Sequence, residues 1–271
     1  MNKKIFVIFT DLDGTLLDHE TYSYEGASKV LQIIEKESIP LVLSSSKTRF
    51  EIEKIREKLG LNTPFISENG AAVFFPKEMA SFLPSEALEE EKYCVVKMGV
   101  DYEYICEFEK EIKREVNIRG FCEMDIEEIA RLTGLEYEDA KLAKKREFTE
   151  PFLIEKEEDL LFLKKEAAKR GLKITKGGRF YHLVGAGQDK GKALLVTKKV
   201  YEKIFHSKVT SICAGDSEND YEMLKVCDKA VLIPKPDGRY SDISLPGLIY
   251  ARKPGSRGWG ETIGEILETA N

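Results

Sequence analysis

Short apolar runs alternate with amphipathic segments over the first 75 residues. The runs at 5–10, 39–43 and 64–66 have the length and composition of strands. Between the first two, apolar residues from Ala27 to Ile34 follow the i, i+3, i+4, i+7 spacing of one helix face, and a similar stripe runs from Ile52 to Leu59 before Gly60. Because parallel strands need a crossover segment between them, this alternation predicts a parallel sheet covered by helices.

The same rhythm returns near the C-terminal end. It predicts a helix over 190–204, strands at 209–214 and 230–233, and a helix near 221–226 between those strands. If the strands at both ends belong to one sheet, the fold class is α/β, with a doubly wound, Rossmann-like parallel-sheet core. This core would be discontinuous and would comprise residues 1–77 and 188–271.

The intervening residues 78–187 differ in composition and in the pattern of apolar positions, and they are predicted to form an inserted α/β cap domain. They combine acidic stretches, helical patterns and a strand-like segment at 93–98. Near the end of this region, the strand-like segments 172–175 and 179–184 are joined through Gly177-Gly178, which predicts a hairpin. Gly185 and Gly187 then mark a hinge to the core.

Composition and charge narrow the classes of function. The 42 Lys and Arg residues against 48 Asp and Glu give a net charge of −6, which leaves no general excess of positive charge for nucleic acid or an anionic membrane. No apolar run has the length of a membrane span. The five cysteines are odd in number and form no C-x-x-C pair, so buried free thiols and a cytoplasmic location are expected.

Two carboxylates follow the first predicted strand directly. Asp11 and Asp13 lie at i and i+2, so their side chains point to the same side of an extended chain. Two like charges at this distance are tolerable when a cation or a proton lies between them, and both situations suit catalysis. The alternative is an Asp-Gly turn with Thr15 as a helix cap.

A second acidic string, Gly215 to Asp220, follows the strand at 209–214. It adds Asp216 and Asp220 at the carboxyl end of another strand, and carboxylate oxygens are the ligands that Mg²⁺ prefers. By itself this string also fits a capped helix start. Two such strings at the ends of predicted parallel strands favour one shared site.

Two further strand ends offer groups that could bind an anion. Ser45 and Ser46 follow the strand at 39–43 and supply hydroxyl and backbone N–H groups at the start of a helix. Lys190 is the first residue of the predicted helix over 190–204. A cation at the N-terminus of a helix is disfavoured by the helix dipole, so some other interaction should explain a lysine there. Neutralising a transferring phosphoryl group would be such a reason, and a solvated surface lysine is the alternative.

Taken in order, these four strings resemble the four motifs of the haloacid dehalogenase superfamily of phosphoryl-transfer enzymes. The segment 67–71 and the insertion after it resemble the branch with an α/β cap. Within that branch, the strings 45–49, 146–152 and 177–182 are similar to the mannosyl-3-phosphoglycerate phosphatase family. The chain departs from much of the branch in carrying Ser45-Ser46-Lys47 in place of Thr-Gly-Arg, so a serine would supply the hydroxyl contact to phosphate.

The resemblance implies a role for each group. Asp11 would be the nucleophile, and Asp13 the general acid and base. Mg²⁺ would be held by Asp11, Asp13 through its backbone carbonyl, and Asp216, with Asp220 orienting the site. The phosphoryl oxygens would be bound by Ser45, Ser46 and Lys190.

The implied substrate is a small phosphorylated sugar-glycerate, mannosyl-3-phosphoglycerate, and the product mannosylglycerate is a compatible solute. Glucosyl-3-phosphoglycerate or another sugar phosphate, a sugar phosphomutase on the same scaffold, and an inactive metabolite-binding protein are the alternatives. The sequence leaves the oligomeric state open. Residues expected to contact the substrate are Asn69, Arg146, Arg179 and His182, with Arg179 best suited to the glycerate carboxylate because a guanidinium pairs with it through two bonds.

Overall fold

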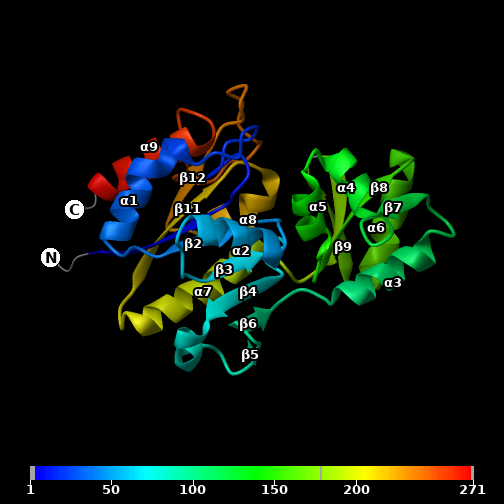
Figure 1. Cartoon of the computed structure of the whole chain (residues 1–271), viewed down its shortest axis with the longest axis horizontal. Coiled ribbons are helices and arrows are strands. Elements are labelled where there is room, and N and C mark those ends of the chain that lie inside the picture. The colour runs from blue at the N-terminus through cyan, green and yellow to red at the C-terminus, as the bar shows by residue number, and fades with distance from the viewer. Residues whose placement is uncertain (1–3, 178, 270–271) are drawn as a thin grey trace.

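A computed structural model describes residues 4–177 and 179–269. These residues form two sheets, one of nine strands and one of four, each with helices on both faces (Figure 1). We call the part built on the nine-stranded sheet the core, and the part built on the four-stranded sheet, residues 102–185, the cap. The strands are β1 (Ile5–Thr10), β2 (Leu41–Ser44), β3 (Phe65–Ser67), β4 (Ala72–Pro76), β5 (Leu88–Glu89), β6 (Tyr93–Lys97), β7 (Ile118–Gly120), β8 (Thr149–Ile154), β9 (Leu172–Gly177), β10 (Phe180–Gly185), β11 (Val209–Gly215), β12 (Lys229–Leu232) and β13 (Ile249–Tyr250).

The core sheet has the order β13-β12-β11-β1-β2-β3-β4-β6-β5. The six strands from β13 to β3 are parallel, as the alternation of apolar and amphipathic segments predicts, and the doubly wound core is confirmed. The strand order reverses at β1, which has β2 on one side and β11 on the other. In open parallel sheets such a reversal opens a crevice at the carboxyl ends of the strands, where ligands bind.

Helices cover both faces of the core sheet because each buries an apolar stripe. Residues of α1, α2 and α9 pack in one cluster with Phe6, Ile8 and Leu43, and residues of α7 and α8 pack on the opposite face with Val7 and Phe9. The alternation of side chains along β1 sends these neighbours to opposite faces. The helices are α1 (Ser28–Lys36), α2 (Arg49–Lys58), α3 (Tyr102–Ile112), α4 (Ile126–Thr133), α5 (Tyr137–Lys144), α6 (Leu160–Lys169), α7 (Lys190–Ile204), α8 (Tyr221–Lys225) and α9 (Gly255–Glu268).

The cap sheet has the order β7-β8-β10-β9 and is antiparallel throughout. The predicted hairpin is confirmed as β9 and β10. Helices α3 and α6 pack on one face of this sheet, and α4 and α5 on the other. Helix α5 also lies against α2 of the core, where Thr48 donates a hydrogen bond to the Leu142 carbonyl over 3.0 Å.

The core sheet extends beyond the position at which the sequence places the cap boundary. Strands β5 and β6 follow residue 77, yet β6 pairs antiparallel with β4 and continues the core sheet. The alternation of strands and helices stops near Lys77 because the sheet continues with antiparallel strands, which need no crossover helix. Residues 78–97 therefore belong with the core sheet, contrary to the sequence-based boundary.

The expectation of five free thiols is wrong for two of them. Cys213 on β11 and Cys227, just after α8, form a disulfide, whereas Cys94, Cys106 and Cys122 are free. The short helix α8 returns the chain to β12, which pairs with β11, and this brings Cys227 beside Cys213. A separation of 14 residues without a recognisable motif gives no such indication.

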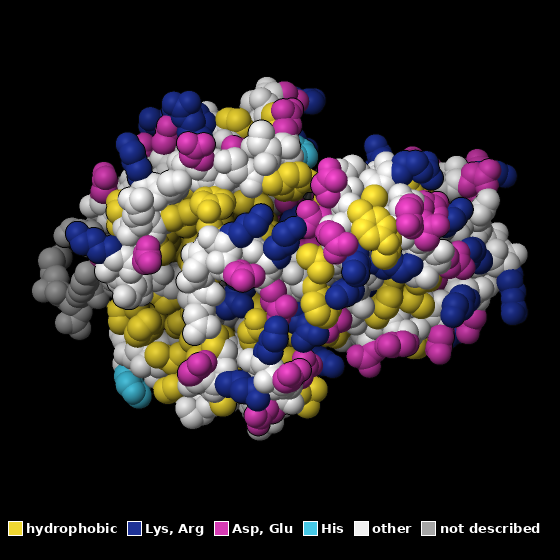
Figure 2. Space-filling model, in the orientation of Figure 1, with side chains coloured by type: hydrophobic (Ala, Val, Ile, Leu, Met, Phe, Trp, Pro, Cys, Tyr) yellow, Lys and Arg dark blue, Asp and Glu magenta, His cyan; other side chains and the backbone are white. Residues whose placement is uncertain are grey.

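The surface carries charges of both signs. Figure 2 shows Lys and Arg side chains interspersed with Asp and Glu over this face of the core and the cap. No helix among the described residues is long and apolar enough to span a membrane.

Trp259 of α9 joins the C-terminal helix to the central strand. Its side chain is fully buried, and its indole Nε1 donates a 2.9 Å hydrogen bond to Thr10 Oγ1 at the end of β1. We predict that Trp259→Phe lowers the free energy of unfolding by about 1–2 kcal/mol, since the ring still fills most of the space and the hydrogen bond is lost. Urea unfolding measures this, with Leu161→Ala at a 65% exposed position as a near-neutral control. Equal stability of Trp259→Phe and the parent protein would contradict it.

Candidate active site

The site lies at the carboxyl end of β1, where the strand order reverses. Asp11 follows β1 directly and is 5% exposed, and its backbone N–H donates to the Ala214 carbonyl of the neighbouring strand over 2.9 Å. Asp13 lies two residues on, and its Oδ1 atom is buried without a hydrogen-bond partner among the described residues. Gly14 follows with φ of +76°, and a Cβ there would meet Asp216 Oδ2 at 2.8 Å. A glycine therefore lets the loop after β1 approach the loop after β11.

Lys190 is the cation at the centre of the site. Its ammonium donates to Asp11 Oδ1 and to Asp220 Oδ1, each over 2.7 Å, and its side chain is fully buried. Burial by itself lowers the pKa of a lysine, but the carboxylates of Asp11 and Asp220 outweigh this and hold the pKa of Lys190 above its ordinary value. The position at the N-terminus of α7, unfavourable for a cation, is thus explained by two buried anions.

Asp220 holds the loop after β11 in place. Its Oδ2 atom accepts hydrogen bonds from the backbone N–H groups of Asp216 at 3.0 Å and Ser217 at 3.2 Å. Gly215 permits this, because a Cβ there would lie within 2.6 Å of the Asp220 side chain. With both of its oxygens engaged, Asp220 orients Lys190 and Asp216.

Three carboxylates of the site could hold a metal ion. Oxygen atoms of Asp11, Asp216 and Asp220 lie within 4.8 Å of one another. Burial raises the pKa of Asp11 well above its usual range, against the opposing effect of Lys190, and burial together with Asp220 raises the pKa of Asp216 to about 6. A divalent cation favours the charged forms and would reverse these shifts. The donor set, all hard oxygen, fits a divalent cation of the Mg²⁺ class.

The loop after β2 brings serine and lysine to the same site. Ser45 is buried, and its Oγ accepts from the Lys47 backbone N–H at 3.2 Å, while Ser46 lines the cleft described below. The Lys47 ammonium lies 2.9 Å from Asp13 Oδ2. The Asp13 and Glu51 carboxylates raise the pKa of Lys47 although burial opposes this, so the lysine stays charged. Lys47 thereby holds the Asp13 carboxyl group in position.

Residues 68–70 form a left-handed loop between the site and the cap. Glu68, Asn69 and Gly70 have φ values of +47°, +59° and +86°, which cost conformational energy for the first two. A Cβ on Gly70 would lie 2.2 Å from the carbonyl oxygen of Asp189. The loop turns the Asn69 side chain into the cleft, where its Oδ1 accepts from Asn219 over 3.1 Å.

Glu68 connects this loop to the cap and to the segment that returns the chain from the cap to the core. Its fully buried carboxylate accepts from the backbone N–H groups of residues 147 and 148 and, at 2.6 Å, from the Thr149 hydroxyl. Its carbonyl oxygen accepts from Gln188 Nε2 at 3.1 Å. The cap is therefore tied to the loop that carries Asn69.

A cleft of about 630 Å³ lies between core and cap above Asp11. Core residues Asp13, Ser46 and Asn69 line it from one side, and Thr175 of β9 and His182 of β10 from the other. The register pairs His182 with Thr175, so both project from the same face of the cap sheet. His182 Nδ1 is buried and has no hydrogen-bond partner among the described residues.

The structure does not bring Arg179 to the cleft. Arg179 is exposed, and its guanidinium donates to the Leu132 carbonyl at the end of α4. Arg179 lies in the turn before β10, and its side chain contacts the end of α4 and does not line the cleft. The prediction that Arg179 receives a substrate carboxylate is not supported by this arrangement.

Arg146 reaches from the cap to the loop after β2 that carries Ser45 and Ser46. It is almost fully buried, and its Nη1 donates to the Ser46 carbonyl over 2.8 Å and to Thr149 Oγ1 over 3.3 Å. Its guanidinium also lies 3.9 Å from the Glu68 carboxylate. Its hydrogen bonds place Arg146 beside the Ser45–Ser46 loop, which it positions.

Sequence reasoning missed Lys47 and Thr175 as site residues. Lys47 follows the two serines at the strand end next to β1, so a basic residue there could have been paired with Asp13. Thr175 gives no comparable signal, because its position depends on how the cap faces the core. The other predicted residues, Asp11, Asp13, Ser45, Asp216, Asp220 and Lys190, converge at one end of the sheet.

Comparisons with known proteins agree with this arrangement. A profile of haloacid dehalogenase-like hydrolases matches residues 8–234. A protein from Persephonella marina named glucosyl-3-phosphoglycerate/mannosyl-3-phosphoglycerate phosphatase is 51% identical over 261 residues, which cover 96% of this chain and 97% of the relative. A protein from Pyrococcus furiosus named mannosyl-3-phosphoglycerate phosphatase is 37% identical, with 84% of this chain and 91% of the relative covered.

Solved structures share the fold at low sequence identity. A protein from Thermoplasma acidophilum has a TM-score of 0.67 at 20% identity, with 98% of each chain covered. A phosphatase of the haloalkanoate enzyme superfamily from Bacteroides thetaiotaomicron has a TM-score of 0.67 at 17% identity, covering all of this chain and 97% of its own. These likenesses show a common fold.

The environment of His182 predicts a pH dependence of stability. Burial, together with the nearby Arg146 charge, lowers the pKa of His182 from 6.5 to about 3. The unfolded chain then binds a proton that the folded chain excludes, so stability is lost as pH falls from about 6.5 toward 3, by up to about 1.4 kcal/mol per pH unit. We predict that His182→Asn loses less stability than the parent protein between pH 7 and pH 5. Thermal unfolding across this range measures it, and parallel curves for the two proteins would contradict it.

Proposed function

Because the chain belongs to the haloacid dehalogenase-like hydrolase family, we propose that it is a Mg²⁺-dependent phosphatase of mannosyl-3-phosphoglycerate and its glucosyl counterpart. The names of the Persephonella and Pyrococcus relatives support this substrate class. The double name of the first supports activity toward both sugars. The products would be phosphate and the corresponding glycosylglycerate.

The observation that carries the proposal is the position of Lys190. Its ammonium bridges the carboxylate of Asp11, at the end of β1, and that of Asp220, which holds the loop after β11. Both lie beneath an open cleft. Asp11 must be charged to act as a nucleophile, and the phosphoryl oxygens of a substrate also carry negative charge. A buried lysine beside Asp11 can neutralise both. Ser45 and Ser46 complete the phosphate site with hydroxyl and N–H donors.

The chemistry follows from the two aspartates. A carboxylate oxygen of Asp11 bonds to phosphorus, the ester oxygen leaves, and Asp13 supplies the proton that this oxygen takes up. Asp13, now charged, then removes a proton from a water molecule, whose oxygen attacks phosphorus and breaks the bond to Asp11. Phosphate is released and both residues return to their initial states. Lys47, at 2.9 Å from Asp13, keeps that carboxyl group directed at the cleft.

Mg²⁺ would be held by Asp11, Asp216 and the backbone carbonyl of Asp13. When bound, it would supply charge neutralisation, so that the phosphate group could approach an acidic site. Asp220 has both oxygens engaged by Lys190 and two backbone N–H groups, which suits it to orient the ligands. Lys190 neutralises the remaining negative charge.

The sugar-glycerate part of the substrate would occupy the cleft toward the cap. His182 is neutral near pH 7 because its pKa is low, and a neutral imidazole donates one hydrogen bond. Thr175 and Asn69 add hydroxyl and amide groups, which suit sugar hydroxyls. Arg146 contributes through the Ser46 backbone.

We predict that Asp11→Asn abolishes phosphate release from mannosyl-3-phosphoglycerate. The amide keeps the shape of the side chain and removes the attacking charge, so the protein still folds. Phosphate release and circular dichroism test the two parts. Retention of more than a few per cent of the activity would rule out Asp11 as the nucleophile.

Metal removal gives a second prediction. A chelator is expected to abolish activity and Mg²⁺ to restore it, because Asp11, Asp216 and the substrate phosphate repel one another without the cation. Titration of Mg²⁺ into chelator-treated enzyme, with phosphate release as readout, measures this. Full activity in the stripped protein would contradict the metal site.

His182 and Arg179 lie on the same hairpin, and the kinetics of variants at the two positions test which one contacts the substrate. His182→Asn should raise KM for mannosyl- and glucosyl-3-phosphoglycerate about three- to tenfold, the effect of one lost hydrogen bond. It should leave activity on p-nitrophenyl phosphate nearly unchanged. Arg179→Ala, the matched control, should change neither, because its guanidinium lies outside the cleft.

Two outcomes would overturn the substrate proposal. Equal kcat/KM for simple sugar phosphates and the phosphoglycerates would show that the cleft does not select glycerate. Transfer of phosphate back to the sugar, without release, would instead identify a phosphomutase. A loss in Arg179→Ala that is confined to the phosphoglycerates would restore that residue as the carboxylate ligand.

A further inference from the structure

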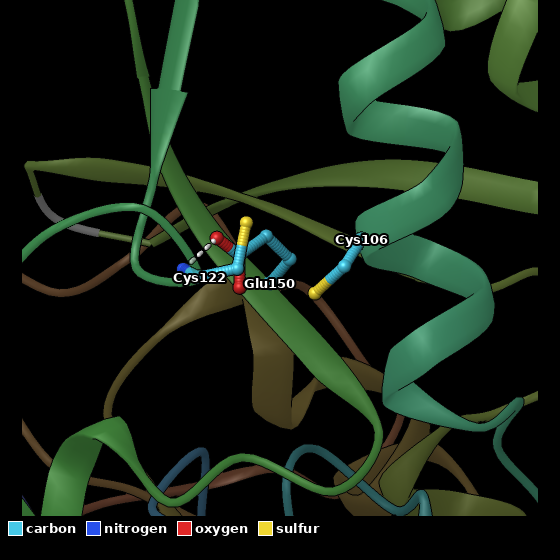
Figure 3. Close-up of side chains that lie close together, drawn as sticks. All are labelled: Cys106, Cys122 and Glu150. Carbon is cyan, nitrogen blue, oxygen red and sulfur yellow. Dashed lines mark hydrogen bonds between the residues drawn. The ribbon is translucent and has the colours of Figure 1, made fainter.

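A second group of potential metal ligands lies inside the cap, away from the phosphatase site. Cys106 projects from α3, Cys122 lies in the turn between β7 and α4, and Glu150 belongs to β8 (Figure 3). The two Sγ atoms and a carboxylate oxygen of Glu150 lie within 4.8 Å of one another. Three segments distant in sequence thus direct two thiols and a carboxylate at one point.

Glu109, one turn after Cys106 on α3, lies beside this group. Its Oε2 atom lies 3.6 Å from Cys122 Sγ, and its side chain is fully buried. Two ligands of a tetrahedral zinc ion, one sulfur and one oxygen, lie roughly 3.5 Å apart, given bonds of about 2.3 and 2.0 Å. The spacing of Glu109 and Cys122 matches this geometry.

Gly120 leaves the space in which the two carboxylates meet. A Cβ at this position would lie 2.0 Å from Glu150 Oε1 and 2.3 Å from Glu109 Oε2. Both glutamates are buried. Two carboxylates brought together away from water repel when both are charged, so the cluster must hold a cation or a proton.

We propose that Cys106, Cys122 and Glu150, with Glu109 beside them, form a structural site for a thiophilic divalent cation of the Zn²⁺ class. Thiolate sulfur selects such ions over Mg²⁺, whose preferred ligands are oxygen. The group lies inside the cap and none of its residues lines the cleft, so the role of the ion would be structural. The site is independent of the proposed phosphatase function.

Surrounding hydrogen bonds hold the donors in place. The Cys122 backbone N–H donates to Glu150 Oε1 over 2.8 Å, the dashed line in Figure 3, and the Gly120 N–H donates to Glu109 Oε1 over 2.9 Å. The Tyr102 hydroxyl donates to the other oxygen of Glu150. Such outer contacts orient metal ligands and raise affinity. Cys122 is partly exposed, which gives an ion a path from solvent.

The proposed metal site lies where a bound cation would join several elements of the cap close to the core. Glu150 is adjacent to Thr149, whose hydroxyl donates to Glu68 of the core. Tyr102, at the start of α3, donates through its backbone to the Glu147 carbonyl over 3.0 Å. A bound cation would fix α3, the turn after β7 and β8 to one another at the end of the cap that meets the core.

Cobalt binding to the full-length protein tests the proposal. The protein is freed of metal by a chelator, kept reduced, and titrated with Co²⁺ in excess Mg²⁺, which occupies the oxygen-only site. We expect one equivalent of Co²⁺ to give an intense near-ultraviolet thiolate-to-cobalt band and the visible bands of tetrahedral coordination. Zn²⁺ should then displace the cobalt and bleach both.

Matched variants assign the ligands. Cys106→Ala and Cys122→Ala should each weaken Co²⁺ binding on the order of 100-fold or more and reduce the charge-transfer band. Glu150→Gln keeps the side-chain volume and should shift the visible bands. Cys94→Ala, which removes a buried free thiol on β6 of the core, should leave the spectrum unchanged. Asp216→Asn should do the same, because it alters only the phosphatase site.

Thermal unfolding gives a second readout that does not depend on activity. Zn²⁺ should raise the unfolding temperature of the parent protein and of Cys94→Ala, but not that of a folded Cys106→Ala. Absence of a thiolate band in the parent protein, or its persistence in the Cys106→Ala/Cys122→Ala double variant, would overturn the proposal. Either result would leave two carboxyl groups that share a proton.

Discussion

The neutralisation of buried carboxylates by Lys190 is the constraint on which this molecule depends. Asp11 and Asp220 are both buried, and each would be strongly destabilised without a cation nearby. Lys190 is fully buried between them, at 2.7 Å from each. The three residues come from the start of the chain, from the segment after the cap, and from the loop after β11. The two halves of the core must therefore assemble before these charges are compensated.

This constraint explains why much of the site could be predicted from the sequence. Carboxyl ends of parallel strands lie along one edge of a sheet, so recognising strands before Asp11, Ser45 and Asp216 is enough to bring those residues together. The sequence predicts the first strand with its observed bounds, Ile5–Thr10, because its apolar residues stop abruptly at the first aspartate. The helix at 190–204 has equally clear limits.

Other features depend on contacts that no local pattern contains. Strands β4, β5 and β6 extend the core sheet by antiparallel pairing, and the sequence offers no sign of which sheet such strands join. The disulfide between Cys213 and Cys227 follows from the pairing of β11 with β12. Arg179 has suitable chemistry for a carboxylate, but it lies in the turn of the hairpin, and its side chain contacts the end of α4. His182, three positions later on β10, lines the cleft.

Glu68 has a consequence for the movement that the cap can make. The cap, through residues 147–149, and the segment that returns from the cap to the core, through Gln188, are both hydrogen bonded to this one residue. A sliding displacement of the cap would break all of these bonds together. The left-handed backbone at 68–70 is therefore a fixed point between core and cap, and the Arg146–Ser46 and Thr48–Leu142 hydrogen bonds restrain the cap at two further positions.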